Sequence, residues 1–120
     1  MRNVLLLVLT LCGASLCFGA EVYPSQPVRL IVPFGPGGSS DVFGRVISQP
    51  LAEQLGKQFI IENRPGAGGR IGTAVVAKAA PTGYVLLVTD AGLTIYPSLY
   101  KSLPYDVVND FTPITQILRM

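Results

Sequence analysis

Three short runs of β-branched and apolar residues recur along the chain, and a loop containing glycine follows each of them. The runs lie at residues 28–33, 58–63 and 84–89. Between them, apolar residues recur at helical spacing over residues 40–55 and, more briefly, 70–80. Apolar strands that alternate with helices are typical of parallel sheets with both faces covered. The sequence therefore predicts an α/β fold, an open parallel sheet built from βαβ units.

The first of these helices carries signals at both ends. Ser39 or Ser40 suits its N-cap, Asp41 stands in the first turn, and Gly56 is placed to stop it. The part of the chain after the third run is less regular. We expect a loop there with at most one helical turn, at 98–101, and then a fourth strand at residues 113–118.

Residues 1–20 have the layout of a secretory signal peptide. One positive charge, Arg2, precedes an apolar stretch over residues 4–11, and small residues follow it. The apolar stretch is too short to span a bilayer. Cleavage is expected after Gly19 or Ala20, and an amino-terminal membrane anchor is the alternative. Both cysteines fall in this segment, so the mature chain, residues 21–120, is expected to contain no disulfide.

The composition argues against several classes of function. The chain has no histidine, which excludes a Ser-His-Asp or Cys-His nucleophile and disfavours a zinc site. Nine Lys and Arg residues stand against seven Asp and Glu, for a net charge of +2, and they form no basic stripe. Nucleic acid is therefore not an expected partner, and no metal or other cofactor is predicted.

The loops that follow the strands are the main functional signal. In a parallel sheet with right-handed crossovers, the loops at 34–40, 63–69 and 89–94 share the edge at the carboxyl ends of the strands, where ligands bind. Two of these loops are rich in glycine, and two lead into the N-terminus of a helix, which offers unpaired amides to an anion. Ser39 and Ser40 add hydroxyl groups. The pattern predicts a small positive socket for an anion.

The known phosphate-binding motifs are absent. No glycine is followed by the Lys-Ser/Thr pair of a Walker loop, and the G-x-G-x-x-G spacing fails at Ser40 and at Ile71. The glycines also have a purely structural interpretation as tight turns. On that interpretation Asp41 caps the helix, and Asn63 and Arg64 brace the second loop.

Four segments of the chain together resemble one family. They are "YPSQPVRLIVPFGPGGSSDVFGRVI", "IIENRPGAGGRIGTAVVAKAAPTGY", "YPSLYKSLPYD" and "DFTPI", in that order. The sequence is similar over residues 23–117 to the amino-terminal part of the Bug (TctC-type) receptors of tripartite tricarboxylate transporters. The resemblance implies the partial first lobe of a two-domain, Venus-flytrap periplasmic binding protein and no enzymatic activity. It also implies a periplasmic protein that delivers a small organic acid or an amino acid to a membrane permease.

The resemblance also implies a set of ligand-binding residues. In this family, backbone amides, small polar side chains and bridging waters hold the ligand carboxylate. Carried onto this chain, the first loop contributes Phe34, Gly37, Gly38, Ser39 and Ser40, and the third loop contributes Thr89, Asp90, Ala91 and Gly92.

Two features depart from the family pattern. Asp90 stands where small neutral side chains are common, so it either points away from the cleft or pairs with an amine on an amino-acid-like ligand. The chain also stops at Met120, where the family continues into a second lobe, so we expect little ligand binding by residues 21–120 alone. An α/β enzyme or phosphate-ligand domain that uses the glycine loops, and a fragment that binds no ligand, remain the alternatives.

Overall fold

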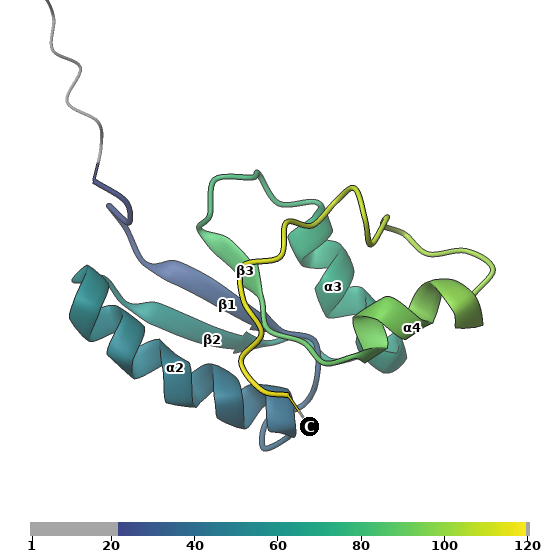
Figure 1. Cartoon of the computed structure of the whole chain (residues 1–120), viewed down its shortest axis with the longest axis horizontal. Helices are drawn as coiled ribbons and strands as arrows, with labels where there is room; N and C mark the ends of the chain where they lie inside the picture. Colours follow the sequence, from purple (N-terminus) through teal and green to yellow (C-terminus); the bar gives the residue numbers. More distant parts are fainter. Residues whose placement is uncertain (1–21, 120) are drawn as a thin grey trace, which may run out of the picture.

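The computed structural model describes residues 22–119, so the predicted signal peptide and its cleavage site lie outside the described residues. The elements follow the predicted alternation (Figure 1). In chain order they are β1 (Val28–Val32), α2 (Ser39–Leu55), β2 (Phe59–Asn63), η2 (Ala67–Gly69), α3 (Arg70–Ala77), β3 (Val85–Leu87) and α4 (Gly92–Leu99). The three strands form one parallel sheet in the order β2-β1-β3. The predicted α/β fold with a parallel sheet is confirmed.

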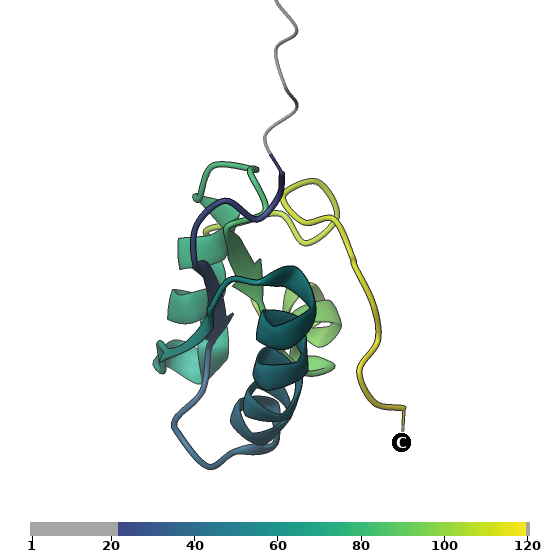
Figure 2. The same cartoon turned by 90° about the vertical axis from the view of Figure 1, so that its left-hand side faces the viewer.

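The central strand β1 sets the arrangement of the helices. Leu30 of β1 pairs with Ile61 of β2 on one side and with Leu86 of β3 on the other. Parallel neighbours need a crossover between them, and α2 and α3 provide the two crossovers. Helix α2 contacts β1 and β2, whereas α3 contacts β1 and β3. Figure 2 shows the two helices on opposite sides of the sheet.

The core lies around β1. Val28 and Val32 are fully buried, and Leu30 is nearly so. Phe59 and Val88 complete the buried cluster, and Phe34 and Ile61 pack against it. A strand covered on both faces cannot alternate polar and apolar residues, which explains the continuous apolar run that the sequence shows at this point.

Helix α3 approaches the sheet closely at Gly72. A Cβ atom at this position would lie 2.6 Å from the Arg64 carbonyl oxygen and 2.8 Å from Pro33 Cα. Both neighbours are backbone atoms that cannot turn aside. The next residue, Thr73, is buried, and its hydroxyl donates to the Gly69 carbonyl at 2.9 Å. A residue without a side chain is therefore what allows α3 to cover β1 and β3.

Two predictions for the last third of the chain are wrong. Helix α4 spans Gly92–Leu99, where at most one turn at 98–101 was expected. Pro97 lies inside α4 and suggests a helix break in the sequence, but the Tyr96 hydroxyl holds the helix by donating to the Gly68 carbonyl. Residues 113–118 form coil, drawn in yellow in Figure 1, and the sheet in the described part of the chain ends at β3. The segment lacks a strand neighbour, and Ile114 is 74% exposed.

None of the helices within residues 22–119 combines the length and the apolar character that a membrane crossing requires.

Gly72→Ala tests the close approach of α3. The added methyl group would overlap backbone atoms, so we expect a loss of about 1–3 kcal/mol in the free energy of unfolding, typical of overpacking. Urea denaturation followed by circular dichroism measures it. Gly35→Ala is the matched control, because a Cβ at Gly35 would have no atom within 4 Å. Equal unfolding midpoints for the two variants would contradict this account.

Candidate functional site

The three loops that follow the strands lie at one edge of the sheet. Because β1, β2 and β3 run parallel, their carboxyl ends point the same way, and α2, α3 and α4 all begin at that edge (Figure 1). Gly37, Gly38 and Gly92 therefore belong to a common edge, as the sequence predicted. A hollow of about 500 Å³ runs along α3 beside Ile71 and Val75 and reaches Ala67 in the second loop.

The first loop ends in an open helix N-terminus. The N-cap of α2 is Gly38, with φ −74° and ψ 166°, and not Ser39 or Ser40 as predicted. A serine was expected because its hydroxyl can bond the first free amides, but here no side chain caps the helix. Within residues 22–119, the amides of residues 38–40 have no hydrogen-bond acceptor. Ser39 is exposed and Ser40 is buried, so the open amides lie at the boundary between the core and solvent.

The Gly37 amide is not part of this open set. Gly37 adopts φ 84°, a left-handed conformation that favours glycine, and its N–H donates to Asp41 Oδ2 at 2.9 Å. Gly37 was expected to contribute its amide to the ligand site. The sequence alone does not reveal that the Asp41 carboxylate, four positions later, already accepts this amide. The side chain of Asp41 thus reaches back past the N-cap Gly38 and bonds the loop, so it braces the loop and does not cap the amides of α2 as considered from the sequence.

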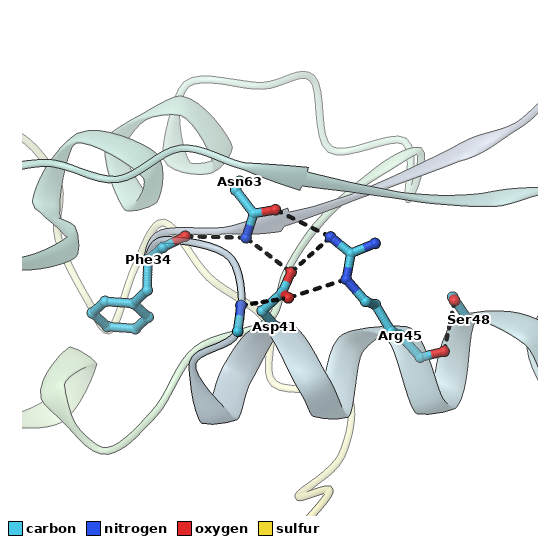
Figure 3. A network of polar contacts seen from close by, with 6 residues as sticks. Phe34, Asp41, Arg45, Ser48 and Asn63 are labelled. Carbon is cyan, nitrogen blue, oxygen red and sulfur yellow. Dashed lines mark hydrogen bonds and ion pairs between the residues drawn. The ribbon is translucent and has the colours of Figure 1, made fainter.

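Asp41 is the centre of a polar network that links the first loop to the second strand (Figure 3). Its side chain is only 4% exposed, and its oxygens accept hydrogen bonds from Arg45 Nε and Nη2, both at 3.0 Å. Asn63 Nδ2 donates to Asp41 Oδ1 at 2.9 Å and to the Phe34 carbonyl at 3.1 Å. These bonds, with those from Arg45 the strongest, hold the pKa of Asp41 well below its ordinary value. The carboxylate is therefore ionised and fully satisfied from within the chain.

Phe34 lies where the first and second loops meet. Its ring is half-buried and packs against the core cluster. It also covers Gly69, where a Cβ would lie 3.1 Å from Phe34 Cε1. Phe34 therefore fixes the spacing between β1 and the start of α3.

The third loop is capped in a similar way. Asp90 Oδ1 accepts the Gly92 amide at 2.9 Å, an arrangement common where an Asp side chain bonds two residues ahead. Asp90 and Ala91 are exposed, and Thr89 and Gly92 are partly buried. The Gly92 amide is therefore also engaged, and one oxygen of Asp90 is turned toward the start of α4.

Several residues that shape this edge were not predicted. Tyr96 ties α4 to the second loop through the Gly68 carbonyl, and the Arg70 guanidinium stacks on the Tyr100 ring at 3.9 Å from the ring centroid. The contact of Arg45 could have been predicted from the sequence, because Arg45 follows Asp41 at the i,i+4 spacing of helical ion pairs. The contacts of Tyr96 and Arg70 could not, because they depend on how α4 packs.

The comparison with family models identifies the chain. Residues 43–120, more than half of the sequence, match the family described as "Tripartite tricarboxylate transporter family receptor". The chain belongs to this family. It is 43% identical over 107 residues to protein BugT of Bordetella pertussis, an alignment that covers 88% of this chain and 33% of BugT. The chain therefore spans about a third of the length of BugT.

Solved structures of similar proteins agree with the fold. The periplasmic binding protein BugD is 43% identical with a TM-score of 0.73, over 77% of this chain and 31% of BugD. An R. palustris protein with adipate is 38% identical with a TM-score of 0.72, over 76% of this chain and 31% of that one. MatC from Rhodopseudomonas palustris, with bound malate, is 36% identical with a TM-score of 0.64, over 76% of this chain and 31% of MatC. The predicted fold, part of a periplasmic binding protein, is confirmed; the division into residues 1–20 and 21–120 stays a prediction.

The Asp41 network predicts a specific dependence of stability on pH. Because the pKa of Asp41 is lowered in the folded state, its carboxylate stabilises the fold fully above the unfolded-state pKa of about 4. This stabilisation is lost as the pH falls below that value toward the pKa of the folded state. We expect Asp41→Asn to be less stable than the unchanged chain at pH 7, with a difference that shrinks at pH 3 and below. Urea unfolding at several pH values measures it, and a difference independent of pH would contradict it.

Proposed function

We propose that this chain forms one wall of the ligand site in an extracytoplasmic receptor of a tripartite tricarboxylate-type transporter. The ligand is a small organic acid, and its carboxylate is held at the start of α2. The observation that carries the proposal is the open N-terminus of α2, where the amides of residues 38–40 are free of acceptors within residues 22–119. A helix N-terminus with free amides favours an anion through both hydrogen bonds and the helix dipole.

The composition of this edge suits a carboxylate. Its donors are backbone amides and the Ser39 hydroxyl. The arginines near it have partners within the chain, since Arg45 pairs with Asp41, Arg64 pairs with Glu62, and Arg70 stacks on Tyr100. Such a site offers a limited positive potential, enough for a carboxylate oxygen pair. Adipate and malate, which the two R. palustris structures contain, are both dicarboxylates. The residues assigned to the ligand are Phe34, Gly38, Ser39 and Ser40 from the first loop and Thr89, Ala91 and the free oxygen of Asp90 from the third, with Gly37 and Gly92 shaping the two turns.

The remaining parts of the proposal follow from the family. Its members are receptors that bind solutes, and the protein is accordingly proposed to bind its ligand reversibly without chemical change. Export through the segment 1–20 would place it in the periplasm, where a membrane permease of the same transporter is its partner. No cofactor is assigned.

Ser39→Pro removes one proposed donor while keeping the helix. Proline is well tolerated at the first helical position, and Gly38 already has the extended conformation that a residue before proline requires. We expect Ser39→Pro to weaken binding of adipate or malate by roughly tenfold to a hundredfold, the value of a hydrogen bond to a charged group. Calorimetry on the protein at the full length its gene encodes measures the dissociation constant.

Ser39→Ala is the matched control, because it removes the hydroxyl and keeps the amide. We expect it to bind more tightly than Ser39→Pro, with similar thermal stability for both variants. Equal affinities for the two variants would exclude the Ser39 amide as a donor. A protein stabilised by nucleotides or inorganic phosphate but by no carboxylate would instead support the phosphate-ligand alternative.

A second measurement tests the class of ligand. Asp90 keeps one oxygen free of the Gly92 amide, and that oxygen could pair with a ligand amine. On the hypothesis of an amino-acid-like ligand, a 2-amino dicarboxylate should bind more tightly than the same dicarboxylate without the amine. Asp90→Asn should then remove the preference. Tighter calorimetric binding of the plain dicarboxylate would exclude this role for Asp90 and leave it as the cap of α4.

A further inference from the structure

We propose that Asp41 and Asn63 are positioning residues that lock the first glycine loop in its binding shape. Asp41 takes up the Gly37 amide, and Asn63 holds both ends of the loop, so that the amides of residues 38–40 stay directed at the ligand. This inference rests on the proposed function and assigns to these two side chains a role in affinity without contact to the ligand.

Asp41 acts as an anion that the chain itself supplies to the first loop. Its side chain is 4% exposed and accepts four hydrogen bonds, one from the Gly37 amide, one from Asn63 and two from Arg45. A buried charge with every partner in place is rigid, because each displacement would leave a charged oxygen unsatisfied. The Gly37 amide is thereby withdrawn from the ligand, and the open donors begin one residue later.

The hydrogen bond from the Gly37 amide to Asp41 fixes the backbone conformation of the loop. Gly37 has φ 84°, and the following Gly38 has the extended conformation from which α2 starts. A glycine is free to leave the left-handed region, so the loop needs an external constraint to stay there. The bond from the Gly37 amide to Asp41 is that constraint, and it determines the direction in which the next amides point.

Asn63 is hydrogen-bonded to both ends of the first loop. Its Nδ2 atom donates to the carbonyl of Phe34, where the loop begins, and to Asp41, just after the loop ends (Figure 3). Asn63 itself is the last residue of β2, so the clamp is anchored in the sheet. A donor set held by a rigid element loses less conformational entropy when it binds a ligand.

Arg45 completes the device by balancing charge. Its guanidinium pairs with both oxygens of Asp41 while its own side chain stays 56% exposed. An unbalanced carboxylate beneath the loop would repel a ligand carboxylate, and the ion pair removes most of that repulsion. The alternative explanation is that Asp41 and Arg45 only stabilise α2 as an i,i+4 pair, and the experiment must separate the two.

The test compares Asp41→Asn with Asp106→Asn in the protein at the full length its gene encodes. Asp106 accepts the backbone amides of Val108 and Asn109 at 2.8 and 3.0 Å and the Asn109 side chain at 2.8 Å, and it follows α4, outside the three edge loops. It is therefore an aspartate that, like Asp41, accepts backbone amides, but that lies outside the proposed site. Three quantities are measured for each protein: stability in urea, exchange and chemical shifts of the backbone amides by nuclear magnetic resonance, and the dissociation constant for adipate.

The single acceptor oxygen of Asn cannot serve Gly37, Arg45 and Asn63 together. We therefore expect Asp41→Asn to speed exchange of the Gly37 amide, to shift the amide signals of residues 38–40, and to weaken adipate binding by about tenfold or more. Tenfold corresponds to a loop that keeps its binding shape for about a tenth of the time. Asp106→Asn should lower stability and leave the amide signals of residues 37–40 and the dissociation constant for adipate unchanged. Unaltered signals of residues 38–40 with unaltered affinity in Asp41→Asn would overturn the proposal.

The proposal can still be tested if the variant does not fold or if the protein binds neither ligand. If Asp41→Asn does not fold, Asn63→Ala is judged by the amide signals of residues 38–40 and by the affinity for adipate, because it removes the bonds to Phe34 and Asp41 and keeps the ion pair. If the unchanged protein binds neither adipate nor malate, that failure belongs to the proposed function. The lock is then judged on the protein without ligand, where rapid exchange of the Gly37 amide in the unchanged chain would overturn it.

Discussion

The parallel pairing of β1 with a neighbour on each side is the constraint on which the rest of the structure depends. A strand that pairs with a parallel neighbour at each edge and is covered by a helix on each face is mostly apolar. Val28, Leu30 and Val32 of β1 follow this rule. Parallel neighbours also need crossovers, which brings the loops after all three strands to one edge. The position of the candidate site thus follows from how the core is built.

At that edge, two carboxylates of the chain accept hydrogen bonds from backbone amides of the loops. Asp41 bonds Gly37 in the first loop, and Asp90 bonds Gly92 in the third. Each bond satisfies one donor and leaves the neighbouring donors free. In the first loop, the amides of residues 38–40 are among those left for an external anion, whereas the Gly37 amide is not. Selectivity for a carboxylate can arise in this way without an arginine directed at the ligand.

The family gives this edge its context. The chain spans about a third of the length of BugT, and it carries the sheet edge with the first glycine loop. One wall of a site binds weakly by itself, because most of a small ligand's surface has to be buried to reach useful affinity. On the proposed function, preorganisation of the first loop by Asp41 and Asn63 would suit a site that this edge shares with another part of the protein, because rigid donors lose less conformational entropy on binding.

Much of the fold could be predicted because its signals are local. The three apolar runs, the helical spacing between them and the stop at Gly56 depend on residues a few positions apart, and these predictions held. The predictions that failed depended on distant partners. A strand at residues 113–118 needed a neighbour that the described sheet does not provide, and α4 forms across Pro97 because Tyr96 reaches Gly68.

The sequence by itself determined the order of the elements, the edge at which the loops gather and the residue types available there. Only the tertiary structure decided which of those groups are free. Asn63 lies 22 positions from Asp41 and 29 from Phe34, and no pattern in the sequence joins them. Hydrophobic periodicity records which face of an element is buried, whereas the choice of a hydrogen-bond partner is made when the elements pack.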